Sequence, residues 1–134
     1  MNLQEVCKSL LENADMSIDF SEFPKVNFDI LVHGTVNNKY WKVIFECGQV
    51  VHMDTEFDDE ASYEDLFLIL ETKVEETTKT KVTPAVQHRM DSLKDHDPVW
   101  EIYLYGDISV TLITTKFNWK LTELSKTEYE KAYA

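Results

Sequence analysis

Alternation of apolar and polar side chains along residues 26–47 constrains this chain more than any other feature. The apolar positions are Phe28, Ile30 and Val32 before Asn37-Asn38, and Trp41, Val43, Phe45 and Cys47 after it. A period of two is typical of a β-strand with one buried face, and Asn-Asn tolerates the positive φ of a tight turn. The segment therefore predicts a β-hairpin. The apolar pairs that a two-residue turn predicts are Val32–Val43, Ile30–Phe45 and Phe28–Cys47.

The predicted pairing has one local cost, because it sets Asp29 opposite Glu46, a pair of like charges. It also sets His33 opposite Lys42 on the polar face. After the hairpin, Gly48 is expected to reverse the chain into a third strand over residues 50–55. A three-residue loop there would keep Val51 and Met53 on the apolar face, whereas a two-residue loop would turn His52 inward; we favour the first.

Residues 99–115 predict a second hairpin, with its turn at Gly106-Asp107. Trp100, Ile102 and Leu104 alternate before the turn, and Ile108, Val110 and Leu112 alternate after it. Tyr103 and Tyr105 are expected on the same side as the second set, so that both faces carry apolar residues and are covered at least in part. The next alternating residues, Phe117, Trp119 and Leu121, extend or follow this strand.

The remaining segments predict short helices and connections. Residues 3–13 have helical apolar spacing after Asn2, a suitable N-cap, and residues 15–24 are expected to form a loop anchored by Phe20 and Phe23. The pattern over residues 63–75 fits helix or strand, and the apolar run 66–70 favours strand. Thr83-Pro84 predicts the start of a helix, and Ser125-Lys126-Thr127-Glu128 is a capping box. The chain is thus expected to be a single α+β domain over residues 1–134. We expect a mainly antiparallel sheet of five to seven strands with short peripheral helices at the N-terminus, middle and C-terminus.

The net charge of −12 excludes classes of partner. Binding to nucleic acid or to an anionic membrane needs a basic surface, so neither is expected. Residues 43–72 contain nine acidic residues and no Lys or Arg, and therefore hold −9 of the −12. The N-terminus does not resemble a signal peptide and no apolar run is long enough to span a membrane, so a cytoplasmic location is expected. Cys7 and Cys47 are expected to be free thiols.

No motif predicts a catalytic residue, a metal ligand or a cofactor. His33, His52, His88 and His96 lack the spacing of a metal site, and both cysteines lack a neighbouring base. Asp54, Glu56 and Asp58 alternate as in a calcium loop, but Asp59 stands where the turn needs glycine and Asp65 where a bidentate Glu is needed. The three tryptophans, Trp41, Trp100 and Trp119, are expected in the core.

The sequence hypothesis for function is a non-enzymatic protein-binding module that uses an acidic surface to bind a basic protein partner. An exposed acidic segment would steer such a partner, and two aromatic residues would anchor it. The residues assigned to this surface are Asp54, Glu56, Phe57, Asp58, Asp59, Glu60, Tyr63, Glu64 and Asp65. In composition the chain is similar to small bacterial immunity-type proteins and inhibitors, and the sharpest form of the hypothesis is inhibition of a basic nuclease-like target. The alternatives are a small metal-dependent hydrolase with carboxylate and His ligands, and an interaction protein whose acidic face only aids solubility.

Overall fold

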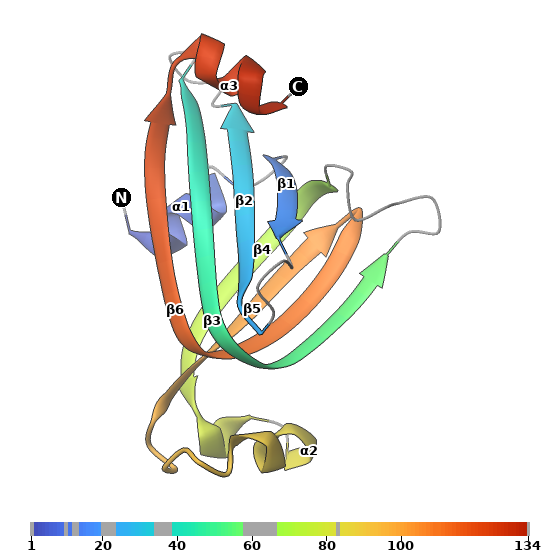
Figure 1. Cartoon of the computed structure of the whole chain (residues 1–134), viewed down its shortest axis with the longest axis vertical. Helices are drawn as coiled ribbons and strands as arrows, with labels where there is room; N and C mark the ends of the chain where they lie inside the picture. The colour runs from blue at the N-terminus through green and yellow to red at the C-terminus, as the bar shows by residue number, and fades with distance from the viewer. Residues whose placement is uncertain are drawn as a thin grey trace.

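In the part of the chain that the structure describes, six antiparallel strands form a closed barrel in the order β1-β2-β3-β6-β5-β4 (Figure 1). The computed structural model describes residues 2–9, 11, 14–19, 24–33, 39–57, 67–82 and 84–133. The strands are β1 (Ala14–Asp19), β2 (Val26–His33), β3 (Tyr40–Phe57), β4 (Phe67–Thr78), β5 (Pro98–Gly106) and β6 (Ile108–Leu124). With three short helices, this architecture confirms the predicted α+β class and its mainly antiparallel sheet.

The helices lie at the periphery of the barrel, as the sequence predicts. They are α1 (Leu3–Ser9), α2 (Pro84–Gln87) and α3 (Lys126–Tyr133), with 3₁₀ turns η1 (Lys79–Lys81) and η2 (His88–Met90) flanking α2. Asn2 caps α1, because its Oδ1 accepts a hydrogen bond from the Glu5 backbone N–H at 2.9 Å. The capping box of α3 also forms: the Ser125 N–H donates to Glu128 Oε1, and the Glu128 N–H donates to Ser125 Oγ.

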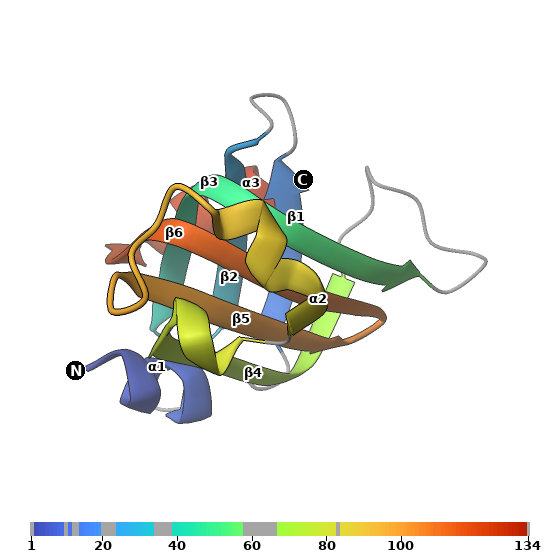
Figure 2. The same cartoon turned by 90° about the horizontal axis from the view of Figure 1, so that it is seen from below.

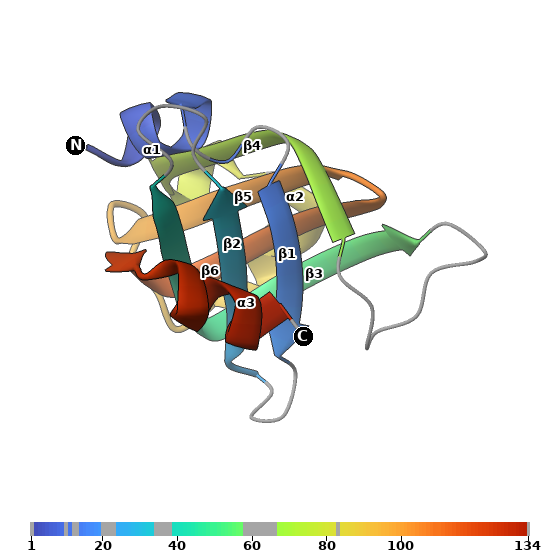
Figure 3. The same cartoon turned by 90° about the horizontal axis from the view of Figure 1, so that it is seen from above.

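The barrel interior is the main hydrophobic core. Its largest fully buried side chains include Phe28, Phe45, Met16, Ile102 and Leu112. Two residues from the N-terminal segment, Val6 and Leu11, belong to the same core, so α1 helps to close the barrel beside β4 (Figures 2 and 3).

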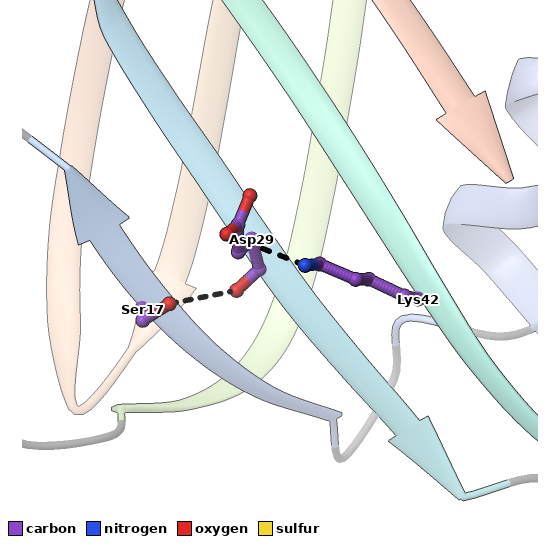
Figure 4. A network of polar contacts seen from close by, with 3 residues as sticks. All are labelled: Ser17, Asp29 and Lys42. Carbon is purple, nitrogen blue, oxygen red and sulfur yellow. Dashed lines mark hydrogen bonds and ion pairs between the residues drawn. The ribbon is translucent and has the colours of Figure 1, made fainter. Parts of the chain in front are cut away.

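The first hairpin forms, but its predicted register is wrong by two residues. Phe28 lies opposite Phe45 and Ile30 opposite Val43, instead of Cys47 and Phe45. A shift of two leaves every side chain on its own face, so the apolar pattern alone could not distinguish the two registers. The observed register removes the predicted repulsion, because Asp29 lies opposite Ile44 and pairs with Lys42 at 3.7 Å (Figure 4). The backbone carbonyl of Asp29 accepts a hydrogen bond from the Ser17 hydroxyl in the same view.

The predicted reversal at Gly48 is wrong, because β3 continues without a turn to Phe57. The long strand β6 pairs with β3 over its whole length, from Tyr40–Leu124 to Phe57–Ile108, and this pairing outweighs a local turn. The chain bends where Gln49 has a φ of 58° and where a bulge lies between Val50 and His52. Bulges of this kind increase the local twist of a strand. Beyond the bulge, Met53 packs on the barrel core, whereas Val51 packs outside the barrel.

The predicted loop over residues 15–24 is also wrong in its first part, which forms β1. Ala14, Met16 and Ile18 alternate, and this short signal marks a strand that pairs with β2 and, at its start, with β4. These pairs close the barrel. Phe20 and Phe23 lie outside the described residues. The apolar run that was ambiguous between helix and strand belongs to β4 from Phe67 onward, as favoured, and residues 63–66 lie outside the described part.

The second hairpin is confirmed, but its tyrosines lie on the other side from the one predicted. Leu104 lies opposite Val110, which centres the turn on Asp107 and directs Tyr103 and Tyr105 outward. Asp107 exchanges two hydrogen bonds with Leu68: the Asp107 N–H donates to the Leu68 carbonyl, and the Leu68 N–H donates to Asp107 Oδ2. Gly106 is required at this contact, because a Cβ there would lie 1.9 Å from the Leu68 carbonyl oxygen.

Candidate protein-binding face

The outer side of β4, β5, β6 and β3 carries rows of side chains that the strand register defines. Directly opposed residues of antiparallel strands point to the same side of a sheet. The first row is Glu71, Tyr105, Ser109 and Glu56, and the second is Lys73, Tyr103, Thr111 and Asp54. The third row is Glu75, Glu101, Ile113 and His52. We call seven of these residues the acidic sheet face: Asp54, Glu56, Glu71, Glu75, Glu101, Tyr103 and Tyr105.

Negative charge on this face is poorly compensated. Glu75 lies directly opposite Glu101, which is an unfavourable pair of like charges. Lys73 pairs with Glu75 at 3.1 Å, and these three rows contain no other Lys or Arg. Five carboxylates therefore share one lysine on a single face of the sheet.

The tyrosines lie in the middle of the acidic sheet face. Tyr105 is 46% exposed, one of the most exposed large hydrophobic side chains of the described residues. Tyr103 is half-buried and lines a shallow depression of about 380 Å³, together with Glu71, Lys73, Glu75, Glu101, Ile102 and Thr111. This arrangement combines an aromatic surface with surrounding negative charge.

One end of the same strands is covered rather than open. Val99 and Ile113 point outward but are buried against Val86 and Met90, which belong to α2 and η2 (Figure 2). Arg89 Nη1 lies 3.4 Å from Nδ1 of His52 at the boundary of this covered region. The prediction that both faces of the hairpin are covered in part is thus confirmed at this end.

The opposite wall of the barrel provides a contrast in charge. On the outer side of β2, β3 and β6, Asp29 pairs with Lys42, and Glu46 pairs with Lys120 at 3.0 Å. Acidic residues on that wall thus have basic neighbours, and we call this surface the balanced wall.

The structure places part of the surface predicted from the sequence on the acidic sheet face. Asp54 and Glu56 are exposed there, and Phe57 is the last residue of β3. The other predicted residues lie outside the described ranges: Asp58, Asp59, Glu60, Tyr63, Glu64 and Asp65. Sequence reasoning missed Glu71, Glu75, Glu101, Tyr103 and Tyr105 as members of the surface. The signal that could have found them is the pairing of the second hairpin with β3, which is a contact between segments distant in sequence.

Residues considered for other chemistry do not converge in the described part of the chain. No group of three or more His, Cys, Asp or Glu residues there could hold a metal ion. Cys7 is a half-buried and Cys47 a buried free thiol, and burial raises the pKa of Cys7 to about 11 and that of Cys47 to about 12. Trp41 and Trp119 are partly buried against the barrel core. The half-buried Trp100 lies with its ring 6.4 Å from that of Phe117.

Comparisons with models of protein families, with curated proteins and with solved structures find no match to this chain. Within the described residues, no helix has the length and apolar character needed to cross a membrane.

Proposed function

We propose that this protein is a non-enzymatic binding module whose acidic sheet face binds a basic surface of a partner protein. The observation that carries the proposal is the gathering of five carboxylates around Tyr103 and Tyr105 on an open sheet face.

The uncompensated negative charge of the acidic sheet face favours a basic partner. Glu75 and Glu101 repel one another in the free protein, and a Lys or Arg of a partner would relieve this repulsion. Uncompensated charge on one face also raises the rate of encounter with an oppositely charged protein, and salt screens this attraction. The balanced wall of β2, β3 and β6 offers no comparable field, since its acidic residues already pair with lysines.

The two tyrosines of the acidic sheet face would provide the contact area that charge alone does not. Energetic hot spots of protein interfaces are rich in Tyr, Trp and Arg, because large rigid side chains lose little entropy and bury much area. Tyr105 is exposed without a covering element in the described chain. It would anchor a partner, and its ring face would also accept an arginine side chain.

A charge-neutral variant of the face tests the proposal. Asp54→Asn, Glu56→Gln, Glu71→Gln and Glu101→Gln together remove four charges but keep the Lys73–Glu75 ion pair. The matched control removes four exposed charges elsewhere: Asp91→Asn, Asp95→Asn, Glu123→Gln and Glu130→Gln. Association of a labelled polyarginine peptide is measured by stopped-flow fluorescence at low and at physiological ionic strength.

We expect the face variant to associate about tenfold more slowly than the control variant at low salt, with a weaker salt dependence. Tyr105→Ala should leave the association rate unchanged and raise the dissociation rate. Equal rates for the two four-site variants would show that the acidic sheet face acts only as a solvated surface. Inhibition of a basic nuclease-like protein is the narrower form of this proposal.

A further inference from the structure

Among the described residues, one side of β4 is an unpaired edge along most of its length. β1 pairs with β4 only at Phe67, Leu68 and Ile69. From Leu70 to Thr78, no strand of the described residues pairs with that side, whereas β5 pairs with the other side from Glu71 to Thr78. Every second residue of such an edge directs its backbone N–H and C=O away from the sheet.

A groove lies between β4 and α1, two elements that stand side by side in Figures 2 and 3. Its volume is about 550 Å³. The residues that line it are Leu3, Gln4, Cys7 and Lys8 from α1, and Leu70, Glu71, Thr72, Lys73, Val74 and Glu75 from β4. Six consecutive residues from a strand can line one groove only if the groove follows the edge, because alternate side chains point to opposite faces.

Two side chains of the groove wall lack the contacts that such groups usually make in a folded protein. Leu70 is 47% exposed, although its side chain is large and apolar. The Thr72 hydroxyl is buried and has no hydrogen-bond partner among the described residues. The wall therefore contains exposed apolar surface, an unpaired hydroxyl and an unpaired strand edge.

The groove is continuous with the acidic sheet face. Glu71, Lys73 and Glu75 line both the groove and the shallow depression in front of Tyr103. A segment that occupied the groove would therefore lie next to the carboxylates for which we propose a basic partner.

We propose that the groove takes an extended segment of the basic partner, which pairs with the edge of β4 as an additional strand. This inference rests on the proposed function and specifies how the partner binds. Side chains on one side of the segment would stand beside Glu71, Lys73 and Glu75, and those next to the two carboxylates should be Lys or Arg. Those on the other side would face Val74, Leu3 and Cys7, and these should be small and apolar. Main-chain hydrogen bonds would give affinity, and the alternating side chains would give specificity.

The experiment uses a labelled octapeptide of alternating valine and arginine as the probe, with the full chain. Two further peptides carry N-methyl groups either on all valine amides or on all arginine amides, at unchanged charge. In an added strand, only alternate residues bond to β4, so one methylated peptide should lose its main-chain donors and the other should keep them. We expect the affinity of one to fall about tenfold or more and that of the other to stay within about threefold, measured by fluorescence anisotropy.

A protein variant locates the site of binding. Leu70→Arg introduces a positive charge into the groove at an exposed position and should weaken binding of the unmodified peptide. Thr122→Arg adds the same charge at an exposed position on β6, on the balanced wall, and should weaken it much less.

The outcomes separate this inference from the proposed function. Equal binding of the two methylated peptides would overturn strand pairing. The proposed function would not be affected, because the polyarginine experiment tests it separately. Equal effects of Leu70→Arg and Thr122→Arg would overturn the groove as the site, and so would failure of the unmodified peptide to bind. Self-association that Leu70→Arg abolishes, measured by analytical ultracentrifugation, would assign the edge to a second copy of the chain and overturn the proposed occupant.

Discussion

The two ends of the outer face of β5 and β6 differ in what covers them. At one end, Val99 and Ile113 are buried beneath Val86 and Met90. At the other, Tyr103 and Tyr105 stand among carboxylates, and no described element packs over them. The same two strands thus present apolar residues where a helix covers them and charged or amphipathic residues where none does. The difference indicates that the open end is encoded in the sequence, because an outer sheet face that is to be covered needs apolar side chains.

The largest loss of stability is expected when a fully buried side chain of the barrel core is truncated. Phe45 is completely buried in the barrel core, with its ring 5.5 Å from that of Phe117. Phe45→Ala should lower the free energy of unfolding by about 3–5 kcal/mol, because it removes buried area and leaves a cavity. Urea denaturation measures this change. A loss below about 1 kcal/mol would contradict the description of the barrel interior as the main core.

The next prediction compares the two ends directly. Ile113→Ala should lower the free energy of unfolding by about 2–4 kcal/mol, because Ile113 is only 6% exposed beneath α2 and η2. Tyr105→Ala should change it by less than about 0.5 kcal/mol, as is usual for surface positions. Both values come from the same urea titration. Similar losses for the two variants would mean that Tyr105 supports the fold rather than an open binding face.

The reactivity of the two thiols measures how deeply each is buried, Cys7 at the groove and Cys47 in the barrel core. Burial raises the pKa of Cys7 to about 11, so the thiolate fraction of Cys7 still rises steeply where an ordinary thiol is already deprotonated. Its rate of alkylation by iodoacetamide should increase about tenfold per pH unit between about pH 8 and pH 10. Cys47, whose pKa is raised to about 12, should react more slowly still. A plateau for Cys7 near pH 9 would show that its thiol is not buried between α1 and the barrel. Mass spectrometry of the alkylated peptides measures both rates.

The smallest effect is expected at α3, which covers little of the barrel. The backbone N–H and then the side chain of Ser125 donate to Glu128 and lower its pKa. A lowered pKa means that the cap is fully formed above the ordinary range of a glutamate and is lost as the pH falls through the pKa of the folded state. The carboxyl carbon of Glu128 should therefore titrate below the ordinary range of a glutamate in an NMR titration. Ser125→Ala removes the side-chain contribution and should raise the pKa of Glu128 toward its ordinary value, and an unchanged Glu128 titration in that variant would contradict the capping box.

Local signals in the sequence identify most of the fold. Alternation finds the two hairpins, and caps find the helices at both ends. The errors arise where long-range pairing decides the structure. The register of β2 and β3 could not be chosen from alternation, because both registers keep Phe28 and Phe45 inside. The continuation of β3 past Gly48 depends on β6, which lies more than fifty residues further along the chain.

The candidate site was predictable only in part for the same reason. The acidic stretch is visible as composition, and the surface predicted from it includes Asp54 and Glu56, which are exposed. Glu101 and Tyr103 lie in a different hairpin, with no local signal to connect them with that stretch. Their place beside Asp54 follows from the pairing of β6 with both β3 and β5.

Chemical-shift mapping of backbone amides tests most directly whether the acidic sheet face is the binding surface. A ¹⁵N-labelled chain would be titrated with the polyarginine peptide at physiological ionic strength. The account predicts that the perturbed amides cluster at Asp54, Glu101, Tyr103 and Tyr105 and along β4. Perturbations centred instead on the balanced wall, around Lys42 and Lys120, or spread evenly over all acidic residues, would contradict it.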